Sequence, residues 1–254
     1  MGNEVLYEVS GQVAVITINR PEKRNALNAA TRQGLWDAWR RFEADANARV
    51  AILTGAGEKA FCAGIDLSEF SETGMGAPPP DFLPDLGRNI TISKPTIAAV
   101  RGVAYAAGWR LAQMCDLCVA GEPARFAIPE ALVGRGAAWA APLVHMIPPR
   151  VMLELLLTAQ PITAQRAWEI GFVNRVVPDS EVLSAARAMA EAIVAGAPLF
   201  GAAAKRMMNA AFGVPAEEGL RAAEAIFEPV YNSADAREGP RAFHEKRKPT
   251  WLGR

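Results

Sequence analysis

Two short segments rich in small residues are positioned to bring backbone N–H groups against a ligand. Residues 60–67 have the sequence AFCAGIDL, and residues 101–108 have the sequence RGVAYAAG. Small side chains let the backbone approach a ligand closely. In the second segment a strand is expected to end and a helix to begin, so its amides would carry a partial positive charge. Two N–H donors converging on one oxygen are what an oxyanion requires. Tight packing of a turn against a helix is the alternative, and these segments alone leave both open.

Other patterns give weaker evidence for a cofactor or a metal. Gly55 and Gly57 follow an expected strand, but the third glycine of a dinucleotide fingerprint is absent, so no nicotinamide cofactor is predicted. Cys115 and Cys118 form a C-x-x-C pair in the apolar stretch MCDLCVA. On a strand their sulfurs would face opposite sides, which favours two small buried hydrophobic residues. With two histidines and no second cysteine pair, the sequence predicts no metal site.

The composition indicates a globular protein whose net charge does not attract a strongly charged partner. Its 254 residues are 51% hydrophobic and 21% charged, and 27 Lys and Arg balance 27 Asp and Glu. Zero formal charge gives no attraction to nucleic acid or to an anionic membrane, so neither partner is expected. No apolar run approaches the roughly 20 residues of a membrane span. The start, MGNEVLYEVSGQ, lacks an export signal, and three cysteines are an odd count, which together favour a reduced, cytoplasmic protein.

Alternating strand and helix patterns predict an α/β fold. Apolar segments rich in β-branched residues indicate strands at Val13 to Ile18, Val50 to Thr54, Thr96 to Val100, Asp116 to Ala120 and Val173 to Val177. Asn28 is the expected N-cap of a helix between the first two. The apolar stripe of that helix is formed by Leu35, Trp36, Trp39 and Phe42.

Two further regions differ from this alternation. Ser71 to Gly87 is dense in Pro and Gly and predicts a flexible flap near a site. After Pro178, three amphipathic helices are expected at Ser180 to Gly196, Pro198 to Ala210 and Pro215 to Val230. Their apolar faces pack either on the core or on another subunit, and the sequence leaves both possible.

Four ordered segments make the chain similar to the crotonase (enoyl-CoA hydratase/isomerase) superfamily nearly from end to end. They are FCAGIDL, GVAYAAGWRLAQMCDLCVAGEPARFAIPEALVGRG, PITAQRAWEIGFVNRVVP and EGPRAFHEKRKPTWLGR. The resemblance implies a spiral of ββα units at residues 1–196, for acyl-CoA binding and catalysis, and a C-terminal helical trimerisation region at 197–254. It also implies a homotrimer or a dimer of trimers. Coenzyme A would enter as part of the substrate, with no separate cofactor.

The resemblance also implies roles for individual residues. The backbone N–H groups of Ile65 and Ala107 would hold the thioester oxygen, and Glu130 would be the acid/base; the alternative for Glu130 is a surface carboxylate after a proline turn. Residues implied in substrate or CoA binding are Lys23, Arg24, Ala26, Leu27, Ala63, Asp66, Leu67, Ser68, Gly108, Arg110, Phe243 and Lys246. Phe243 and Lys246 correspond to residues that reach the CoA nucleotide from a neighbouring subunit.

The chain departs from the hydratase pattern at several positions. Arg110 stands where hydratases of this family have the first of two catalytic glutamates, and arginine cannot act as a base at ordinary pH. A guanidinium pointing into the site would pair with Glu130 and lower that residue's pKa. Ala107 replaces the usual glycine. Trp109 and Trp139 add bulk nearby, either as core residues or as substrate contacts.

The sequence therefore predicts an enoyl-CoA hydratase/isomerase-type enzyme that works through an oxyanion-stabilised enolate. A single carboxylate suits double-bond isomerisation better than hydration. The alternatives are an acyl-CoA hydrolase, decarboxylase or racemase, in which Arg110 holds a substrate carboxylate, and a protein that binds a CoA ester without turnover.

Overall fold

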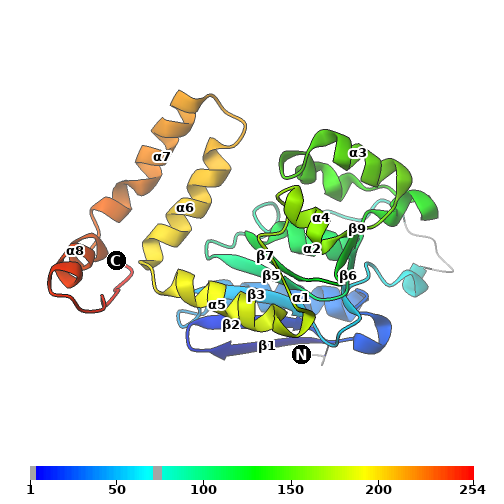
Figure 1. Cartoon of the computed structure of the whole chain (residues 1–254), viewed down its shortest axis with the longest axis horizontal. Coiled ribbons are helices and arrows are strands. Elements are labelled where there is room, and N and C mark those ends of the chain that lie inside the picture. The colour runs from blue at the N-terminus through cyan, green and yellow to red at the C-terminus, as the bar shows by residue number, and fades with distance from the viewer. Residues whose placement is uncertain (1–3, 71–75) are drawn as a thin grey trace.

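The structure is a computed structural model that describes residues 4–70 and 76–254 (Figure 1). In these ranges the larger sheet has the strand order β1-β2-β3-β5-β7-β10. Its strands are Val5–Ser10 (β1), Val13–Ile18 (β2), Val50–Gly55 (β3), Thr96–Val100 (β5), Leu117–Gly121 (β7) and Arg175–Val177 (β10). β1 pairs with β2 antiparallel, and the other neighbours are parallel. The predicted α/β class is confirmed.

A smaller sheet has the order β4-β6-β8-β9. Its strands are Ala60–Cys62 (β4), Val103–Tyr105 (β6), Arg125–Ala127 (β8) and Ile162–Thr163 (β9). The chain moves from the larger to the smaller sheet three times, from β3 to β4, from β5 to β6 and from β7 to β8. Gly102 makes the second crossing at φ +61, where a Cβ would lie 2.2 Å from the Lys59 carbonyl oxygen. Only glycine fits this corner.

Helices cover both faces of the larger sheet, as a mostly parallel sheet requires. The α-helices are Ala29–Ala44 (α1), Ala107–Met114 (α2), Pro149–Thr158 (α3), Ala164–Glu169 (α4), Val182–Val194 (α5), Pro198–Ala211 (α6), Ala216–Tyr231 (α7) and Asp235–His244 (α8). Short 3₁₀ helices are Pro21–Lys23 (η1), Leu67–Phe70 (η2), Pro129–Val133 (η3), Ala138–His145 (η4) and Asp179–Glu181 (η5).

Strand alternation divides the buried core between these faces. Ala14, Ile16 and Ile18 of β2 pack in the same cluster as Leu35 and the other buried apolar residues of α1. Val13 and Val15 point to the opposite face, where α5 contributes Val182, Ala186 and Ala190, spaced four residues apart. The regular alternation of each strand thus fixes which helix covers which face.

Three sequence predictions need correction or limits. Asn28 does cap α1, because its side-chain oxygen accepts a hydrogen bond from the Thr31 N–H at 2.8 Å. Trp36, however, is not part of the buried stripe: it is half-buried, and its Nε1 donates to the Asp81 carbonyl. The prediction of one strand holding both Cys115 and Cys118 is wrong, since Cys115 caps the end of α2 and only Cys118 lies on β7.

The predicted flap is irregular but anchored where it is described. Residues 71–75 of the predicted segment lie outside the described residues, whereas residues 76–87 form neither helix nor strand. The Asn89 side chain donates to the carbonyls of Pro80 and Leu83, and the Leu83 side chain is buried. These contacts hold the second half of the loop against the core.

The chain after α5 forms a separate helical arm. α6 and α7 lie antiparallel beside the sheet layers, and α8 lies at the end farthest from α3 (Figure 1). The domain boundary predicted at residues 196 and 197 stays a prediction.

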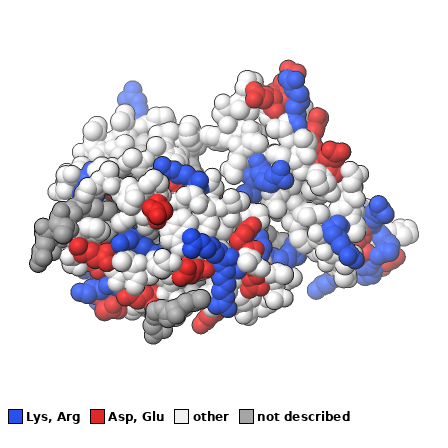
Figure 2. All heavy atoms as spheres, turned by 180° about the vertical axis from the view of Figure 1, so that it is seen from behind, with Lys and Arg blue, Asp and Glu red and all other residues white. Residues whose placement is uncertain are grey.

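Among the described residues no single helix is long and apolar enough to cross a membrane. One pair of helices, Asp179–Val194 with Pro198–Ala211, meets the length and composition of a span but is bent by 105°. Acidic and basic side chains are interspersed on the face shown in Figure 2.

Candidate functional site

Three neighbouring parallel strands of the smaller sheet end at one edge. β4 is followed by Gly64 and Ile65, β6 by Ala106 and Ala107, and β8 by η3 with Glu130. The carboxyl ends of adjacent parallel strands are a common ligand-binding edge in α/β proteins. The three residues predicted to be catalytic, Ile65, Ala107 and Glu130, therefore emerge at the same edge.

The Ile65 N–H points away from the neighbouring loop that contains Leu27. Leu27 and Ile65 form a parallel bridge in which the Leu27 N–H donates to the Gly64 carbonyl and the Asp66 N–H donates to the Leu27 carbonyl. In a parallel bridge the middle residue directs its own N–H to the opposite side. Within the described part of the chain the Ile65 N–H has no acceptor.

The start of α2 lies against the same turn. A Cβ on Gly64, at φ +112, would lie 3.2 Å from the Ala106 Cβ and 3.9 Å from the Ala107 nitrogen. Gly108 packs so closely on β4 that a Cβ would lie 2.1 Å from the Cys62 carbonyl oxygen. Ala107 is the first residue of α2, so its N–H has no carbonyl partner within the helix. It is the second N–H donor at this edge that has no acceptor among the described residues.

A strained residue sets the direction of the Ala107 amide. Ala106, just before the helix, has φ +52 and ψ −121, a conformation that favours glycine and costs a residue with a Cβ of order 1–3 kcal/mol. The sequence pointed to Ala107 as the departure from glycine, but the backbone places the strain at Ala106.

Glu130 is a buried carboxylate with one free oxygen. Only 8% of the residue is exposed, and its Oε1 accepts a hydrogen bond from the Trp139 indole Nε1 at 2.6 Å. Its Oε2 is buried and has no hydrogen-bond partner among the described residues. Burial raises the pKa of Glu130 above its usual value, and the Trp139 bond lowers it in part. The interpretation of Glu130 as an ordinary surface carboxylate is therefore wrong.

Arg110 pairs with a residue that the sequence did not single out. Its Nη2 lies 3.0 Å from the Oδ2 of Asp85, which belongs to the irregular loop before β5. The Arg110 side chain is 12% exposed and the Asp85 side chain is 19% exposed. Its Nε is buried without a partner among the described residues. The conditional prediction of an Arg110–Glu130 pair that lowers the Glu130 pKa is wrong, because the guanidinium takes Asp85 and the Glu130 pKa is raised.

The predicted CoA-binding residues fall into two groups. Residues 23–27 run beside residues 63–66, since the Ala63 N–H donates to the Arg24 carbonyl and Leu27 bridges to Ile65. Asp66 is held by Arg20 Nη1 at 3.1 Å. The side chains of Lys23, Arg24, Leu67 and Ser68 are exposed next to this loop pair, and Ala26 is half-buried. Phe243, 87% exposed, and Lys246 lie on and just after α8, away from this edge (Figure 1).

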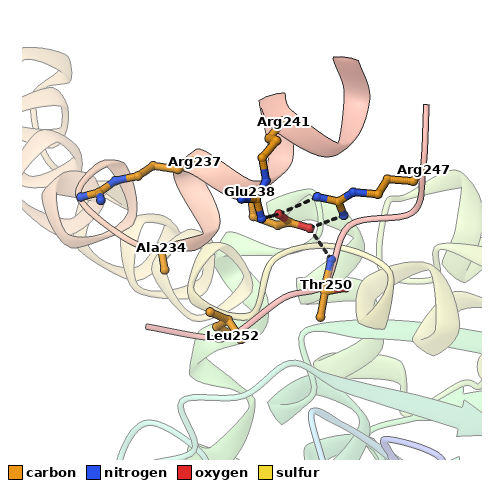
Figure 3. A pocket seen from close by; sticks show the side chains of 7 residues that line it. All are labelled: Ala234, Arg237, Glu238, Arg241, Arg247, Thr250 and Leu252. Carbon is orange, nitrogen blue, oxygen red and sulfur yellow. Dashed lines mark hydrogen bonds and ion pairs between the residues drawn. The ribbon is translucent and has the colours of Figure 1, made fainter. Parts of the chain in front are cut away.

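A pocket at the C-terminal helix α8 is closed by hydrogen bonds and ion pairs that hold the end of the chain in place. It is lined by Ala234, Arg237, Glu238, Arg241, Arg247, Thr250 and Leu252 (Figure 3). The Glu238 carboxylate accepts hydrogen bonds from the Arg241 and Arg247 guanidinium groups and from the Thr250 N–H. These bonds hold its pKa well below the usual range and tie residues 247–254 to α8.

Comparison with known proteins decides the family. The family described as Enoyl-CoA hydratase/isomerase matches residues 8–254. The chain belongs to this family. A carnitinyl-CoA dehydratase of Salmonella typhi is 40% identical, over 96% of this chain and 97% of the relative. The crystal structure of an enoyl-CoA hydratase from Mycobacterium tuberculosis H37Rv matches with a TM-score of 0.91 and 40% identity, over 100% of both chains. A probable enoyl-CoA hydratase/isomerase from Mycobacterium abscessus matches with a TM-score of 0.87 and 42% identity over 100% of both chains.

This enoyl-CoA hydratase/isomerase family enzyme has two site contacts that its sequence did not reveal. Asp85 lies 25 residues from Arg110, and Trp139 lies nine residues from Glu130. The sequence marked Trp109 and Trp139 as either core or site. Trp109 is core, fully buried between Phe126 and Phe172, whereas Trp139 bonds Glu130. No pattern in the sequence distinguishes these two tryptophans.

Proposed function

We propose that this protein moves a proton at the α-carbon of an acyl-CoA thioester, with Glu130 as the acid/base and the Ile65 and Ala107 amides as oxyanion donors. This proposal rests on the buried Oε2 of Glu130, which has no hydrogen-bond partner within residues 4–70 and 76–254. It lies at the strand edge where the Ile65 and Ala107 N–H groups have no acceptor in the same ranges. A buried polar atom without a partner is costly and indicates a functional site.

The chemistry follows from these groups. Glu130 Oε2 takes the α-proton, and the C–H electron pair forms the enolate while negative charge builds on the thioester oxygen. Each preorganised donor lowers this barrier by about 3–4 kcal/mol. The raised pKa of Glu130 brings it closer to working pH, which strengthens it as a base. With a 3-enoyl substrate, the same carboxyl group returns the proton at C4 and leaves a 2-enoyl product.

Arg110 favours this single-carboxylate scheme over hydration. Addition of water is assisted in hydratases of this family by two glutamates, and here the first position carries a guanidinium paired with Asp85. A second candidate is elimination of water from a hydroxyacyl-CoA, which also begins with α-proton removal. The 40% identical relatives named carnitinyl-CoA dehydratase favour it.

The CoA moiety is expected beside the 23–27 and 63–66 loop pair. Lys23 and Arg24 are exposed cations there and suit the nucleotide phosphates, and the half-buried Ala26 suits the pantetheine chain. The Leu27 side chain is fully buried in the core, so only its backbone is left for the proposed CoA contact. Ala63, Asp66, Leu67, Ser68, Gly108 and Arg110 complete the proposed substrate contacts. Coenzyme A is part of the substrate, and no separate cofactor is proposed. The cytoplasmic location expected from the sequence stays a prediction.

We further propose a homotrimer or a dimer of trimers in which α8 of one subunit reaches the CoA of another. Helix α8, which carries Phe243 and ends two residues before Lys246, lies away from the strand edge of its own subunit (Figure 1), so another copy would have to bring these residues to it. Large apolar side chains are exposed on or next to α6 and α7: Phe200, Met208, Phe212, Leu220 and Tyr231. Such exposure is typical of an interface. Light scattering of the purified protein tests this, and a monomer at micromolar concentration contradicts it.

Deuterium exchange at the α-carbon tests the proposed reaction. Butyryl-CoA is incubated with the protein in D₂O, and incorporation is followed by mass spectrometry. We expect exchange with the natural chain and a loss of at least about a hundredfold with Glu130→Gln. Glu122→Gln, which changes an exposed glutamate after β7, is the matched control and should exchange normally.

Three further substrates separate the possible reactions. A 3-enoyl-CoA reports isomerisation, crotonyl-CoA reports hydration through loss of the conjugated thioester absorbance, and carnitinyl-CoA reports elimination. Binding of butyryl-CoA without exchange, isomerisation or elimination would show a binding protein without turnover. Full exchange by Glu130→Gln would show that another group is the base.

A further inference from the structure

We infer that Trp139 is a positioning residue for the reaction: its indole N–H fixes one oxygen of Glu130 and leaves the other free for the substrate proton. This inference rests on the proposed role of Glu130 as the acid/base. The indole Nε1 donates a short hydrogen bond of 2.6 Å to Glu130 Oε1. The Oε2 of the same carboxylate has no hydrogen-bond partner among the residues that the structure describes.

The Trp139 backbone is itself tied to the helix that carries the proposed oxyanion donor. Gln113 of α2 is buried, and its Nε2 donates to the Trp139 carbonyl at 2.7 Å. Gln113 lies six residues after Ala107, on the same helix face as Arg110. A continuous path therefore runs from the α2 N-terminus through Gln113 and Trp139 to Glu130. It fixes the base relative to the amide that receives the developing charge.

Among the described residues, Glu130 forms no hydrogen bond or ion pair with a charged side chain. The causes that set the Glu130 pKa are burial, the Trp139 bond and a backbone hydrogen bond. The titratable side chains on the elements packed around Glu130 are those of Arg110, Arg135, His145, Arg150 and Glu154, and none of them is among these causes of the Glu130 pKa shift. The indole is thus the one side-chain donor recorded for this carboxylate in residues 4–70 and 76–254.

The orientation matters because a carboxylate free to rotate presents either oxygen, and neither consistently, to the α-proton. Misplacement of a catalytic group by about 1 Å can cost on the order of a hundredfold in rate. Removal of the donor also raises the pKa of Glu130, because the hydrogen bond stabilises the charged form. The base is active when deprotonated, so the acid limb of the pH–rate profile should move to higher pH.

The test uses Trp139→Phe, which keeps an aromatic ring and removes the N–H. In the butyryl-CoA exchange assay we expect the acid limb to rise by roughly one pH unit, the plateau rate to fall about tenfold to a hundredfold, and the KM to change less than about threefold. Trp139→His retains a ring N–H and should return the limb towards its original position. Trp168→Phe, at a tryptophan 49% exposed on α4, is the matched control and should leave the profile unchanged. An acid limb in Trp139→Phe that coincides with the natural one overturns the inference.

A second measurement does not depend on turnover. Tryptophan fluorescence is titrated with pH, and the natural chain is expected to show a transition that is lost in both Trp139→Phe and Glu130→Gln. The same transition in all three proteins overturns the inference. Loss in both variants together with no exchange by the natural chain supports the Trp139–Glu130 coupling and refutes the proposed reaction instead.

Discussion

The Arg110–Asp85 pair offers a test of how much a half-buried ion pair stabilises this fold. The perturbation is a charge swap, made as Arg110→Glu, Asp85→Arg and the double variant. The pair has an N–O distance of 3.0 Å and side chains only 12% and 19% exposed. Arg166 and Glu169 on α4 form a pair at the same 3.0 Å with side chains 48% and 44% exposed. The two ion pairs therefore have the same N–O distance and differ in how deeply their side chains are buried.

The expected magnitude lies between those of surface and buried pairs. Exposed pairs contribute about 0–1 kcal/mol, whereas removal of one partner of a fully buried pair costs about 3–5 kcal/mol. For Arg110 and Asp85 we expect each single reversal to lower the free energy of unfolding by about 2 kcal/mol. The double variant should recover much of this, which gives a coupling energy of about 1–2 kcal/mol. The Arg166–Glu169 swap should give less than about 0.5 kcal/mol.

Urea unfolding followed by circular dichroism measures these energies. All variants are compared at one protein concentration, because association would shift the apparent stability, and the coupling is measured again in 1 M salt. Screening should remove the coupling of the α4 pair but only part of that of Arg110 and Asp85. Equal coupling energies for the two pairs would refute the reasoning from burial.

Three other predictions follow from the site. Glu130→Gln should raise the free energy of unfolding above pH 7, because the natural protein then pays the cost of a buried charged carboxylate. The pKa of Glu130 in the folded state is raised from 4.5, so this cost disappears as the pH falls below 4.5. The difference in stability between the two proteins should disappear with it. A gain that persists at pH 4 would contradict this sign. Ala106→Gly should stabilise the fold by about 1 kcal/mol, because φ +52 strains a residue with a Cβ. The control is Ala188→Gly on the exposed side of α5, which should destabilise the fold by about 1 kcal/mol. Denaturant unfolding measures both changes. Arg110→Glu combined with Asp85→Asn should add measurable crotonyl-CoA hydration, because it supplies a second carboxylate without a like charge facing it. A folded double variant without hydration would count against the missing-carboxylate explanation.

Local patterns in the sequence determined much of the architecture. The strands at Val13–Ile18 and Thr96–Val100 have the predicted bounds, and Asn28 caps α1 as expected. These features depend on residues close together in the chain: alternation on a strand and a side chain that bonds an amide three residues later. The short strands β4, β6, β8 and β9 were missed because two or three residues carry no periodicity.

Only the tertiary structure decided which residues form hydrogen bonds and ion pairs with one another in the site. The sequence identified Glu130 and Arg110 as chemically important and left the direction of the Arg110 side chain open, with pairing to Glu130 as one possibility. In the structure Trp139 bonds Glu130, and Asp85 pairs with Arg110. Hydrogen-bond partners depend on where β8, α2, η4 and the 76–92 loop meet, and residue type alone does not encode that meeting. Burial also depends on the tertiary structure. An isolated Ile-Pro-Glu segment leaves the carboxylate in water, whereas the packed fold removes that water and raises the pKa of Glu130. It also leaves one carboxylate oxygen without a partner among the described residues.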